Sequence, residues 1–505
     1  MDSRSRFLRT TLIVSAAFGA VFAIEFLIEW VRLGQPGLAD MSWAGADNKK
    51  IVDILSPMAR AYNNILAMLI ATIGLAIPLT ANMHTPKLID MFLRDRTNQI
   101  MLFLCAFGAA NVLFSAWMVG PHFPTMWAYR VSVVGAILGW AVLVPYFFYV
   151  VRFLDPSNIL ERLQGQVVDA IEQTEAGTLP PDQGQKIVHE RLNQIGTIVL
   201  KSIDRADRSV VVEGVWCFKL ILDSYGVHKA KLPEAWFKVD RQDFVGMSSE
   251  ALEFLNEDRN WFEMKVMLQM FLCYQQALAK SADAVSWISD ATRVIGAAVH
   301  ARQDEPALQL IIKFFNNYLR EAIKRKDMHA LYDLFYQYRS LGRDVLDDPL
   351  AVRKIGQYFR MYANTAGHSG LSFAAQMAAF DVGWLVRRAY QVKSPAAADL
   401  LREVLSFEHE AGGKPQPLVI EAKLILGAGL NQAGFGDAAN QVRDNLRDVP
   451  VATLDQVERN LLGQTERSFW EVTDRQVNFE FVPADRRPFL QQLVAEVRTA
   501  TLAAG

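Results

Sequence analysis

The chain has 505 residues, with 52 Lys and Arg, 54 Asp and Glu, a formal net charge of −2 and 51% hydrophobic residues. This near-neutral balance lacks the basic excess of nucleic-acid-binding proteins, so we expect no nucleic-acid partner. The hydrophobic residues are concentrated in the first third. The rest has the composition of a soluble protein and is long enough for one large domain or two smaller ones.

Four long apolar segments lie in the first 154 residues, at about 10–31, 60–83, 99–119 and 127–153. Each has roughly the 20 residues that a helix needs to cross a hydrocarbon core of about 30 Å. Backbone polar groups cannot bond to water in lipid, and the segments show no period-2 alternation, so we predict four transmembrane helices. The first segment also has the basic start of a secretory signal. Its apolar run continues to Val31, and we therefore interpret it as a retained anchor.

Basic residues in the short loops predict the orientation of these spans. The N-terminus and the loop between spans two and three are basic, through Arg4, Arg6 and Arg9 and through Lys87, Arg94 and Arg96. The loop 120–126 has no charge. With an even number of spans, we expect both termini and the region from residue 155 onward to be cytoplasmic.

Polar residues inside the spans are the candidate pore or intramembrane cluster: Glu25, Glu29, Arg60, Asn63, Asn64, Asn111 and Arg130. Charged groups in lipid face a partner or a water-filled cavity. Two interpretations stay open: structural ion pairs, Glu25–Arg130 and Glu29–Arg60, or a role in permeation or sensing. Asn111 lies near the middle of span three, where an interhelical hydrogen bond is worth about 1 kcal/mol.

The segment Pro86–Asn98 has apolar residues at helical spacing with charges between them. This pattern predicts a short helix on the cytoplasmic membrane surface, with its basic residues near the lipid headgroups. The candidate residues for coupling at the membrane surface are Lys87, Arg94, Asp95 and Arg96.

Beyond the spans, helical periodicity predicts a membrane-proximal helical region at 155–247, a helical-repeat-like domain at 248–411 and a C-terminal helical region at 412–505. Ser157 or Asn158 is the expected cap of the first helix after the spans. The middle domain resembles tetratricopeptide-type helical repeats in texture, but it has no fixed period. We therefore expect an all-α protein with an irregular α-solenoid-like domain. The only strand-like run is Val477–Val482.

Sequence motifs of catalysis are lacking: there is no P-loop, GxSxG elbow, HExxH or CxxC. We therefore expect no enzyme activity, no cofactor and no metal site. His189 and His409 are predicted to be solvent-facing helix residues. Cys105, Cys217 and Cys273 have no paired spacing, so we expect buried thiols in a reducing compartment.

The stretch Thr85–Leu113 resembles the core pattern of bacterial membrane proteins of the domain-of-unknown-function 2254 family. The resemblance rests on Phe92, Leu93, Arg94, Asp95, Arg96, Asn98 and Gln99, which lead into a span. It covers about residues 61–225 and implies a four-span protein of the bacterial inner membrane with a cytoplasmic helical domain. At 202–208 the chain departs from a Ser-Pro-x-x-Asn-Asp-Pro motif of that family, which leaves a role for that motif open.

Two functions from different classes fit these features. The sequence favours a homo-oligomeric, channel-like assembly for ions, in which Glu25 and Glu29 form a carboxylate ring and the cytoplasmic domain regulates it. The alternative is a membrane-anchored scaffold or adaptor whose helical domain binds a partner protein or membrane complex. A transporter has less support, because the spans show no internal duplication. In each case the lipid bilayer is a partner.

Overall fold

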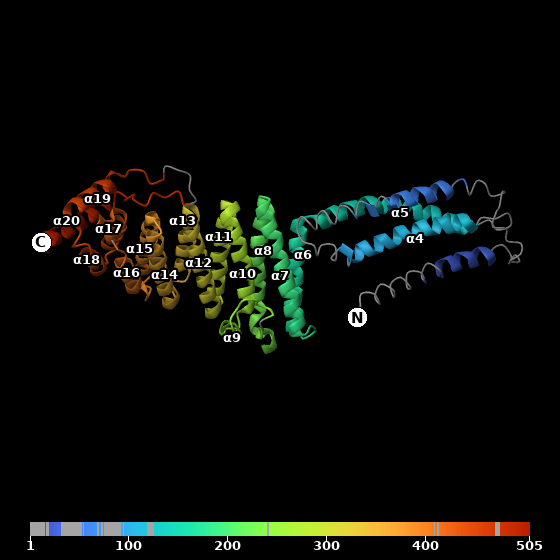
Figure 1. The fold of residues 1–505 in the computed structure, drawn as a ribbon, viewed down its shortest axis with the longest axis horizontal. Coiled ribbons are helices and arrows are strands. Elements are labelled where there is room, and N and C mark those ends of the chain that lie inside the picture. The colour runs from blue at the N-terminus through green and yellow to red at the C-terminus, as the bar shows by residue number, and fades with distance from the viewer. Residues whose placement is uncertain are drawn as a thin grey trace. The chain divides into compact units, whose positions relative to one another are not determined.

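The structure is a computed structural model that describes residues 16, 20–31, 53, 55–67, 70–71, 74, 92–93, 95–118, 126–239, 242–408, 410–411, 414–469 and 475–504. The chain divides into two compact units, Met1–Ile159 (unit 1) and Leu160–Gly505 (unit 2). The described residues of both units are almost entirely helical (Figure 1), as the sequence predicts.

Unit 1 contains helical residues 20–31 and 55–67, followed by α4 (Arg96–Met118) and α5 (Met126–Leu154). Helices α4 and α5 closely match the third and fourth predicted spans. Among the described residues, only α4 is both long and apolar enough to cross a membrane. The four-span layout therefore stays a prediction.

Helix α4 contacts the other described helices of unit 1. On one side, the Phe22 ring stacks on that of Phe114, with 4.5 Å between ring centroids. On another side, Tyr62 is buried against Ala109 and Val112. The Tyr62 hydroxyl also donates to the backbone oxygen of Gly135 on α5, at 2.7 Å. Apolar and aromatic packing around α4 thus joins helices that are distant in sequence.

Helix α6 (Pro156–Glu175) begins with a different cap from the one predicted. Neither Ser157 nor Asn158 caps it. Asp155 Oδ1 accepts a hydrogen bond from the Ser157 backbone N–H at 3.1 Å, and its Oδ2 accepts from Asn158 Nδ2 at 3.1 Å. The helix starts two or three residues earlier than expected because Pro156 suits the first helical position, where no N–H is needed.

The remaining helices of unit 2 are α7 (Pro181–Asp204), α8 (Arg208–His228), α9 (Ser249–Glu257), α10 (Trp261–Lys280), α11 (Ala282–Ala301), α12 (Glu305–Arg325), α13 (Met328–Asp344), α14 (Pro349–His368), α15 (Ser372–Gln391), α16 (Ala397–Leu405), α17 (Pro417–Gln432), α18 (Gly436–Asn445), α19 (Val451–Gly463) and α20 (Arg487–Ala504). Two 3₁₀ turns, Lys229–Lys231 and Glu234–Phe237, precede α9.

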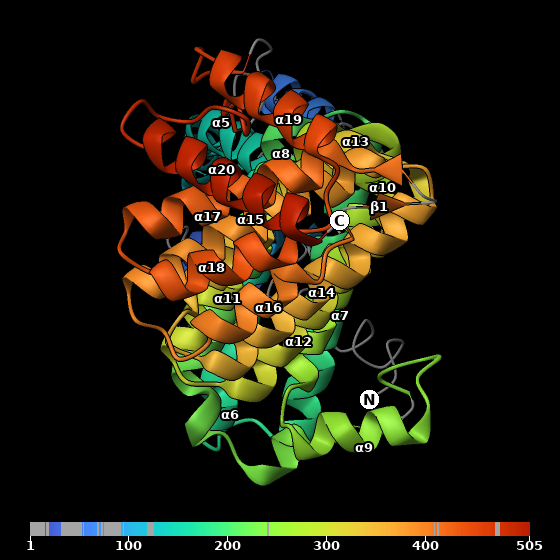
Figure 2. The same ribbon diagram turned by 90° about the vertical axis from the view of Figure 1, so that its left-hand side faces the viewer.

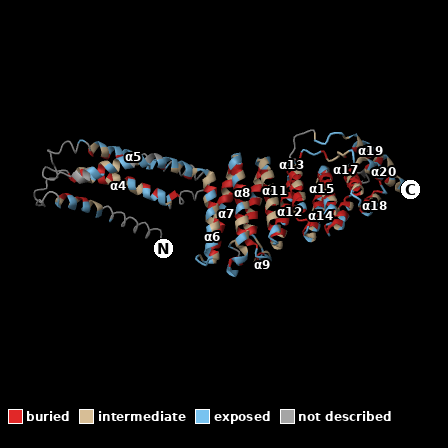
Figure 3. Ribbon diagram, turned by 180° about the vertical axis from the view of Figure 1, so that it is seen from behind, coloured by how far each residue is buried: buried red, intermediate tan, exposed pale blue. Residues whose placement is uncertain are grey.

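These helices form two rows. From α7 to α18, with α9 left out of the sequence, each helix packs against the next helix but one. Each also packs against its successor, except that α16 does not pack closely on α17. The first row is α7, α10, α12, α14, α16 and α18, and the second row is α8, α11, α13, α15 and α17. Helix α9 lies apart from both rows (Figure 2). Buried residues line the faces that the rows turn toward each other (Figure 3).

A recurrent turn makes this close stacking possible. In three connections a residue with positive φ ends one helix, and the next residue is an aspartate that caps the following helix. The pairs are Ala206 and Asp207, Gln303 and Asp304, and Lys326 and Asp327. Each aspartate side chain accepts a hydrogen bond from a backbone N–H in the first turn, which satisfies a donor that the helix cannot.

The strand-like run Val477–Val482 does not form a strand. The segment forms turns, and the strands within the described residues are β1 (Glu410–Ala411) and β2 (Lys414–Pro415), paired antiparallel. The alternation of apolar and polar residues does not match burial here, because Val477 is 49% exposed and Asn478 is buried. Phe479 stacks on Phe380 of α15, with 5.2 Å between ring centroids. No neighbouring extended segment among the described residues pairs with it.

Candidate functional site

A buried polar network joins three helices of unit 1. Glu25, on helix 20–31, is 5% exposed, and Asn111 of α4 is 3% exposed. With the Asn111 amide nitrogen facing the carboxylate, it donates to Glu25 Oε2 at 2.8 Å and to Oε1 at 3.1 Å. The Asn111 oxygen then accepts from Ser132 Oγ of α5 at 3.1 Å. Ser115 Oγ lies 2.8 Å from Ser132 Oγ, so hydrogen bonds run from α5 to the carboxylate.

The network confirms the interhelical hydrogen bond predicted for Asn111. It also gives Glu25 a neutral partner from within the chain. Such bonds are typical of polar groups that hold membrane helices together. Two roles remain for the Glu25 carboxylate, a packing contact and a titrating group, and its burial favours the first.

The other candidates of the cluster fall into two groups. Glu29 is fully buried, like Glu25 and Asn111. The exposed candidates are Arg60, Asn63, Asn64 and Arg130. Arg60 Nε donates to the Ser56 backbone oxygen on its own helix, at 3.4 Å. The structure therefore places the seven residues in an interior set and an exterior set, and the ion pairs Glu25–Arg130 and Glu29–Arg60 stay predictions.

The start of α4 is fastened to the second half of α5. Asp95 Oδ1 accepts from the Asn98 backbone N–H at 3.1 Å and from the Tyr149 hydroxyl at 2.7 Å. Asn98 Oδ1 accepts from the Tyr146 hydroxyl at 3.2 Å, and Asn98 Nδ2 donates to the Phe92 backbone oxygen at 3.1 Å. These contacts give Asp95 and Asn98 a structural role that fixes the α4–α5 pair.

Sequence reasoning missed the two tyrosine partners of this cluster. Tyr146 and Tyr149 belong to an aromatic run that is also typical of a membrane interface, so their hydroxyl contacts were not evident. Of the candidate coupling residues, Arg96 is exposed. Lys87 and Arg94 lie outside the described residues, so their coupling role stays a prediction.

Unit 2 holds a cavity that the sequence did not reveal. It has a volume of about 360 Å³ and lies between α13, α15, α17 and the segment 475–486. Four arginines line it: Arg339, Arg387, Arg475 and Arg486. Its walls are largely aromatic, through Tyr336, Phe380, Trp384, Phe479 and Phe481. No sequence motif predicts such a site, because its residues come from three helices and a distant loop.

One buried carboxylate organises two of these arginines. Asp381 is fully buried on α15. Its Oδ1 accepts from Arg339 Nη1 at 3.0 Å and from Arg475 Nη1 at 3.0 Å. The Arg475 guanidinium also lies over the Tyr332 ring, 4.5 Å from its centroid. These contacts hold the segment 475–486 against the second row and shape the cavity.

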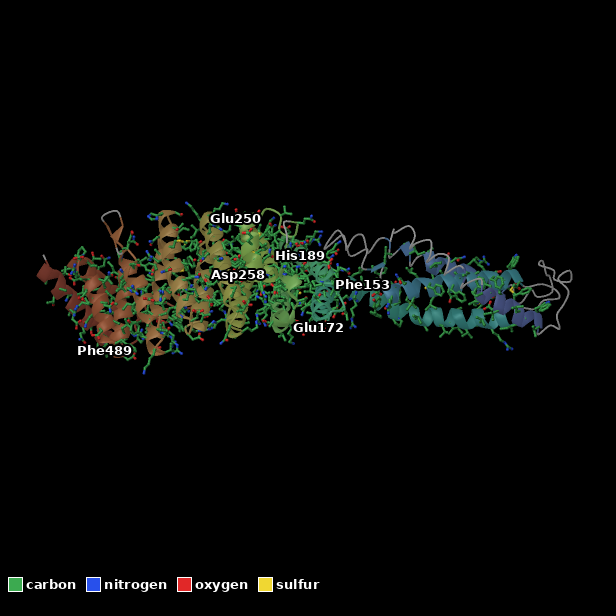
Figure 4. The ribbon with its side chains drawn as sticks, turned by 90° about the horizontal axis from the view of Figure 1, so that it is seen from below. Phe153, Glu172, His189, Glu250, Asp258 and Phe489 are labelled. Carbon is green, nitrogen blue, oxygen red and sulfur yellow. The ribbon has the colours of Figure 1, made fainter. Side chains whose placement is uncertain are left out.

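The prediction for His189 was wrong: the side chain is 8% exposed and lies inside unit 2 on α7 (Figure 4). Its ring packs on that of Trp261, with 4.9 Å between centroids. Burial, with the charge of Lys265, lowers the pKa of His189 to about 4. Asp243 Oδ1, 3.7 Å from His189 Nε2, opposes this shift. The helical spacing of α7 places His189 beside buried Val188 and Leu192 on the core face. His409 lies outside the described residues.

The described residues contain no group of three or more His, Cys, Asp and Glu arranged to hold a metal ion. The three cysteines are free and buried, as expected. Burial raises the pKa of Cys217 and of Cys273 to about 12, which keeps both thiols protonated and unreactive.

The described residues thus define a mainly helical protein with a buried polar network in one unit and a two-row helical array in the other. A family model described as "Predicted membrane protein (DUF2254)" matches residues 3–206. This match confirms the family resemblance seen around the start of α4. It covers nearly all of unit 1 and continues through α6 and α7, so this part of the chain is similar to a family of predicted membrane proteins.

No curated protein matches the chain. One solved structure, titled "Circular tandem repeat protein with novel repeat topology and enhanced subunit contact surfaces", is 12% identical, with 90% of this chain and 98% of that chain covered and a TM-score of 0.25. A likeness at this level supports no inference about fold or function.

Proposed function

We propose that this protein is a membrane-anchored helical scaffold. In this proposal unit 1 spans the bacterial inner membrane four times with both termini in the cytoplasm, and unit 2 is a cytoplasmic α-solenoid that binds a partner protein. The observation that supports it is that, from α7 to α18 and with α9 left out, each helix of unit 2 packs against the next helix but one. Arrays of this kind bury their core between rows and leave long outer surfaces available for recognition.

The first row has side chains suited to such a contact. Leu272 of α10 is 46% exposed, and Met361 of α14 is 47% exposed. Between them in the row, α12 exposes Lys313 and Arg320. The partner that fits this mixture is a protein surface with acidic and apolar side chains, because basic residues favour acidic ones and apolar area is lost from water on contact.

Site-specific photocrosslinking in intact cells tests the scaffold. A crosslinker replaces Leu272 or Met361 in the full-length chain, and we expect one discrete adduct with a different protein. Charge reversal on the same face, Lys313→Glu with Arg320→Glu, should lower the adduct yield about tenfold, since rim charges govern encounter. The control Arg447→Glu changes an exposed arginine elsewhere in unit 2 and should leave the yield unchanged. An absent adduct, or one formed only with a second copy of the chain, contradicts the proposal.

A second candidate, the homo-oligomeric channel-like assembly, is favoured by one observation. The helix 55–67 buries Leu55 and Tyr62 but exposes Arg60, Asn63 and Asn64. Lipid is a poor solvent for such side chains, so a second copy is a suitable cover for them. Burial of Glu25 and Glu29 within one chain favours the scaffold, because a carboxylate ring needs side chains that face a shared channel.

Cysteine crosslinking tests the oligomer. In this second candidate, Asn63→Cys in membranes should form a disulfide-linked dimer on mild oxidation. Phe148→Cys on α5 is the matched control, because Phe148 is an apolar side chain that is 67% exposed. Equal crosslinking at both positions would show that the dimers form by random collision of two chains and not through a specific interface.

A further inference from the structure

The cavity between α13, α15, α17 and segment 475–486 carries an excess of positive charge. Its lining includes the four guanidinium groups named above and no carboxylate. Asp381 lies beneath the lining and pairs with only Arg339 and Arg475. No carboxylate of the lining therefore balances the charge of Arg387, whereas Asp485, outside the lining, opposes part of the charge of Arg486.

Arg387 has the features of a residue that binds an anion. Among the described residues it makes no hydrogen bond and no ion pair, although its guanidinium is half-buried. Burial, together with the charge of Arg486, lowers the pKa of Arg387 to about 10. A protein gains no stability by holding two like charges together in a partly dry site. An anion bound between them would remove that penalty.

Gly429 of α17 makes room for this pair of arginines. A Cβ atom at this position would lie 3.1 Å from Arg387 Cδ, 3.5 Å from Arg387 Nη1 and 3.8 Å from Arg486 Nε. The missing side chain therefore lets both arginines lie against the helix. Arg486 is aligned by Gln432, whose Oε1 accepts from Arg486 Nε at 2.9 Å. This bond leaves the Arg486 terminal nitrogens available.

Other donors in the lining are also unused. Arg339 Nε and Arg475 Nε are buried and make no hydrogen bond among the described residues. Such orphaned buried donors are rare in proteins and call for an acceptor. Planar guanidinium groups match the oxygen geometry of phosphate and carboxylate, and they bind phosphate through paired hydrogen bonds.

The aromatic wall supplies the second half of a binding site. Trp384 lies under the Arg339 guanidinium, 4.7 Å away, and Phe380 stacks with Phe479. A volume of about 360 Å³ is of the size that small-molecule sites have, roughly 300–1,000 Å³. Aromatic rings and arginines together suit a planar ring joined to an anionic group.

We propose that this cavity binds a small phosphomonoester with a planar ring, of the mononucleotide class. The phosphate group lies between Arg387 and Arg486, and the ring lies along the wall of Trp384, Phe479 and Phe481. This site is distinct from the first-row surface proposed for a protein partner. Either proposal can fail without the other.

Titration calorimetry on the full-length protein in detergent tests the site, with adenosine 5′-monophosphate, adenosine and inorganic phosphate as probes. We expect saturable binding of the nucleotide, weaker binding of phosphate and none of adenosine. Arg387→Gln should weaken nucleotide binding about tenfold or more, because it removes charge-assisted hydrogen bonds. The control Arg388→Gln changes the next residue on α15, which is exposed and outside the cavity lining, and should change affinity less than about twofold.

Thermal unfolding without ligand separates a binding role from a structural role. Arg387→Gln should leave the melting temperature unchanged or raise it, because Arg387 has no described partner and lies beside Arg486. The proposal is overturned if the wild-type protein binds no nucleotide, if Arg387→Gln binds it as well as wild type, or if phosphate alone binds as tightly as the nucleotide.

Discussion

Arg475 and Asp381 form a buried ion pair across 94 residues of sequence, with Arg475 Nη1 2.9 Å from Asp381 Oδ2. Both side chains are almost inaccessible to water. The pair holds the loop after α19 against the second row, and Arg475 Nη2 also donates to the Tyr332 backbone oxygen. One carboxylate thus fixes both the path of this loop and the shape of the cavity.

Replacing the Asp381 carboxylate should lower the free energy of unfolding. Asp381→Asn leaves the buried guanidiniums of Arg475 and Arg339 without a counter-charge, and breaking a buried pair from one side destabilises by about 3–5 kcal/mol. Denaturant unfolding of unit 2, followed by tryptophan fluorescence, measures the loss. As a control, Arg447→Gln removes an exposed ion pair with Asp448 and should change little. An Asp381→Asn protein as stable as wild type would mean that the pair does not hold the loop.

A second buried charged side chain, that of Lys423, forms hydrogen bonds at the end of α16. Lys423 of α17 is fully buried, and its Nζ donates to the backbone oxygens of Leu405 and Phe407 at 3.1 and 2.7 Å and to Asn445 Oδ1 at 2.8 Å. Lys423→Met keeps the bulk but leaves three acceptors without a donor. We expect a loss of about 3 kcal/mol or more in the free energy of unfolding, since each of the orphaned buried groups costs about 1–3 kcal/mol. Equal stability of Lys423→Met and the exposed control Lys393→Met would contradict this role.

The pH dependence of stability should report on His189. Its pKa is about 4 when folded, against an ordinary 6.5. Between these values the unfolded chain binds more protons, so stability falls as the pH falls. The loss attributable to this residue should be about 2 kcal/mol between pH 7 and pH 5. His189→Gln should flatten that part of the profile, measured as the difference in unfolding free energy at the two pH values. An unchanged slope in His189→Gln would show that other groups set it.

Disrupting the polar network of unit 1 should also lower the free energy of unfolding, by a different amount. Asn111→Leu removes the donor to Glu25 and the acceptor for Ser132, and interhelical hydrogen bonds in membranes are worth about 0.6–1.7 kcal/mol. We therefore expect a loss of about 1–2 kcal/mol in unfolding from detergent micelles. The control Asn64→Leu changes an exposed asparagine and should be neutral or stabilising. The same loss in both variants would argue against a special role for the network.

Local sequence patterns predicted the parts of the fold that depend on local forces. Hydropathy predicted the ends of α4 and α5 to within three residues, and helical periodicity predicted the helical region that contains α6 and α7. The pattern at Val477–Val482 misled because tertiary contacts bury Asn478, which bonds to Gln464 and to the Glu466 backbone oxygen, and leave Val477 exposed. Helix α19 was not predicted, since its buried residues, such as Leu454 and Val457, are few and lie among polar ones.

The sites depended on contacts that sequence order does not encode. Asn111 could be predicted to bond across helices because an amide in the middle of an apolar span needs a partner. Its actual partners, Glu25 and Ser132, come from two other helices. The arginine-lined cavity depends on α13, α15, α17 and a loop 94 residues beyond Asp381, so no local pattern could reveal it.

Ion flux through the purified protein in liposomes tests the scaffold proposal most directly, because it separates the two candidate functions of unit 1. The wild-type protein is compared with empty liposomes and with the Glu25→Gln/Glu29→Gln variant. The scaffold proposal predicts no flux above that of empty liposomes for either protein. Flux through the wild-type protein, with a selectivity that changes in the variant, would contradict it and place both carboxylates in a pore.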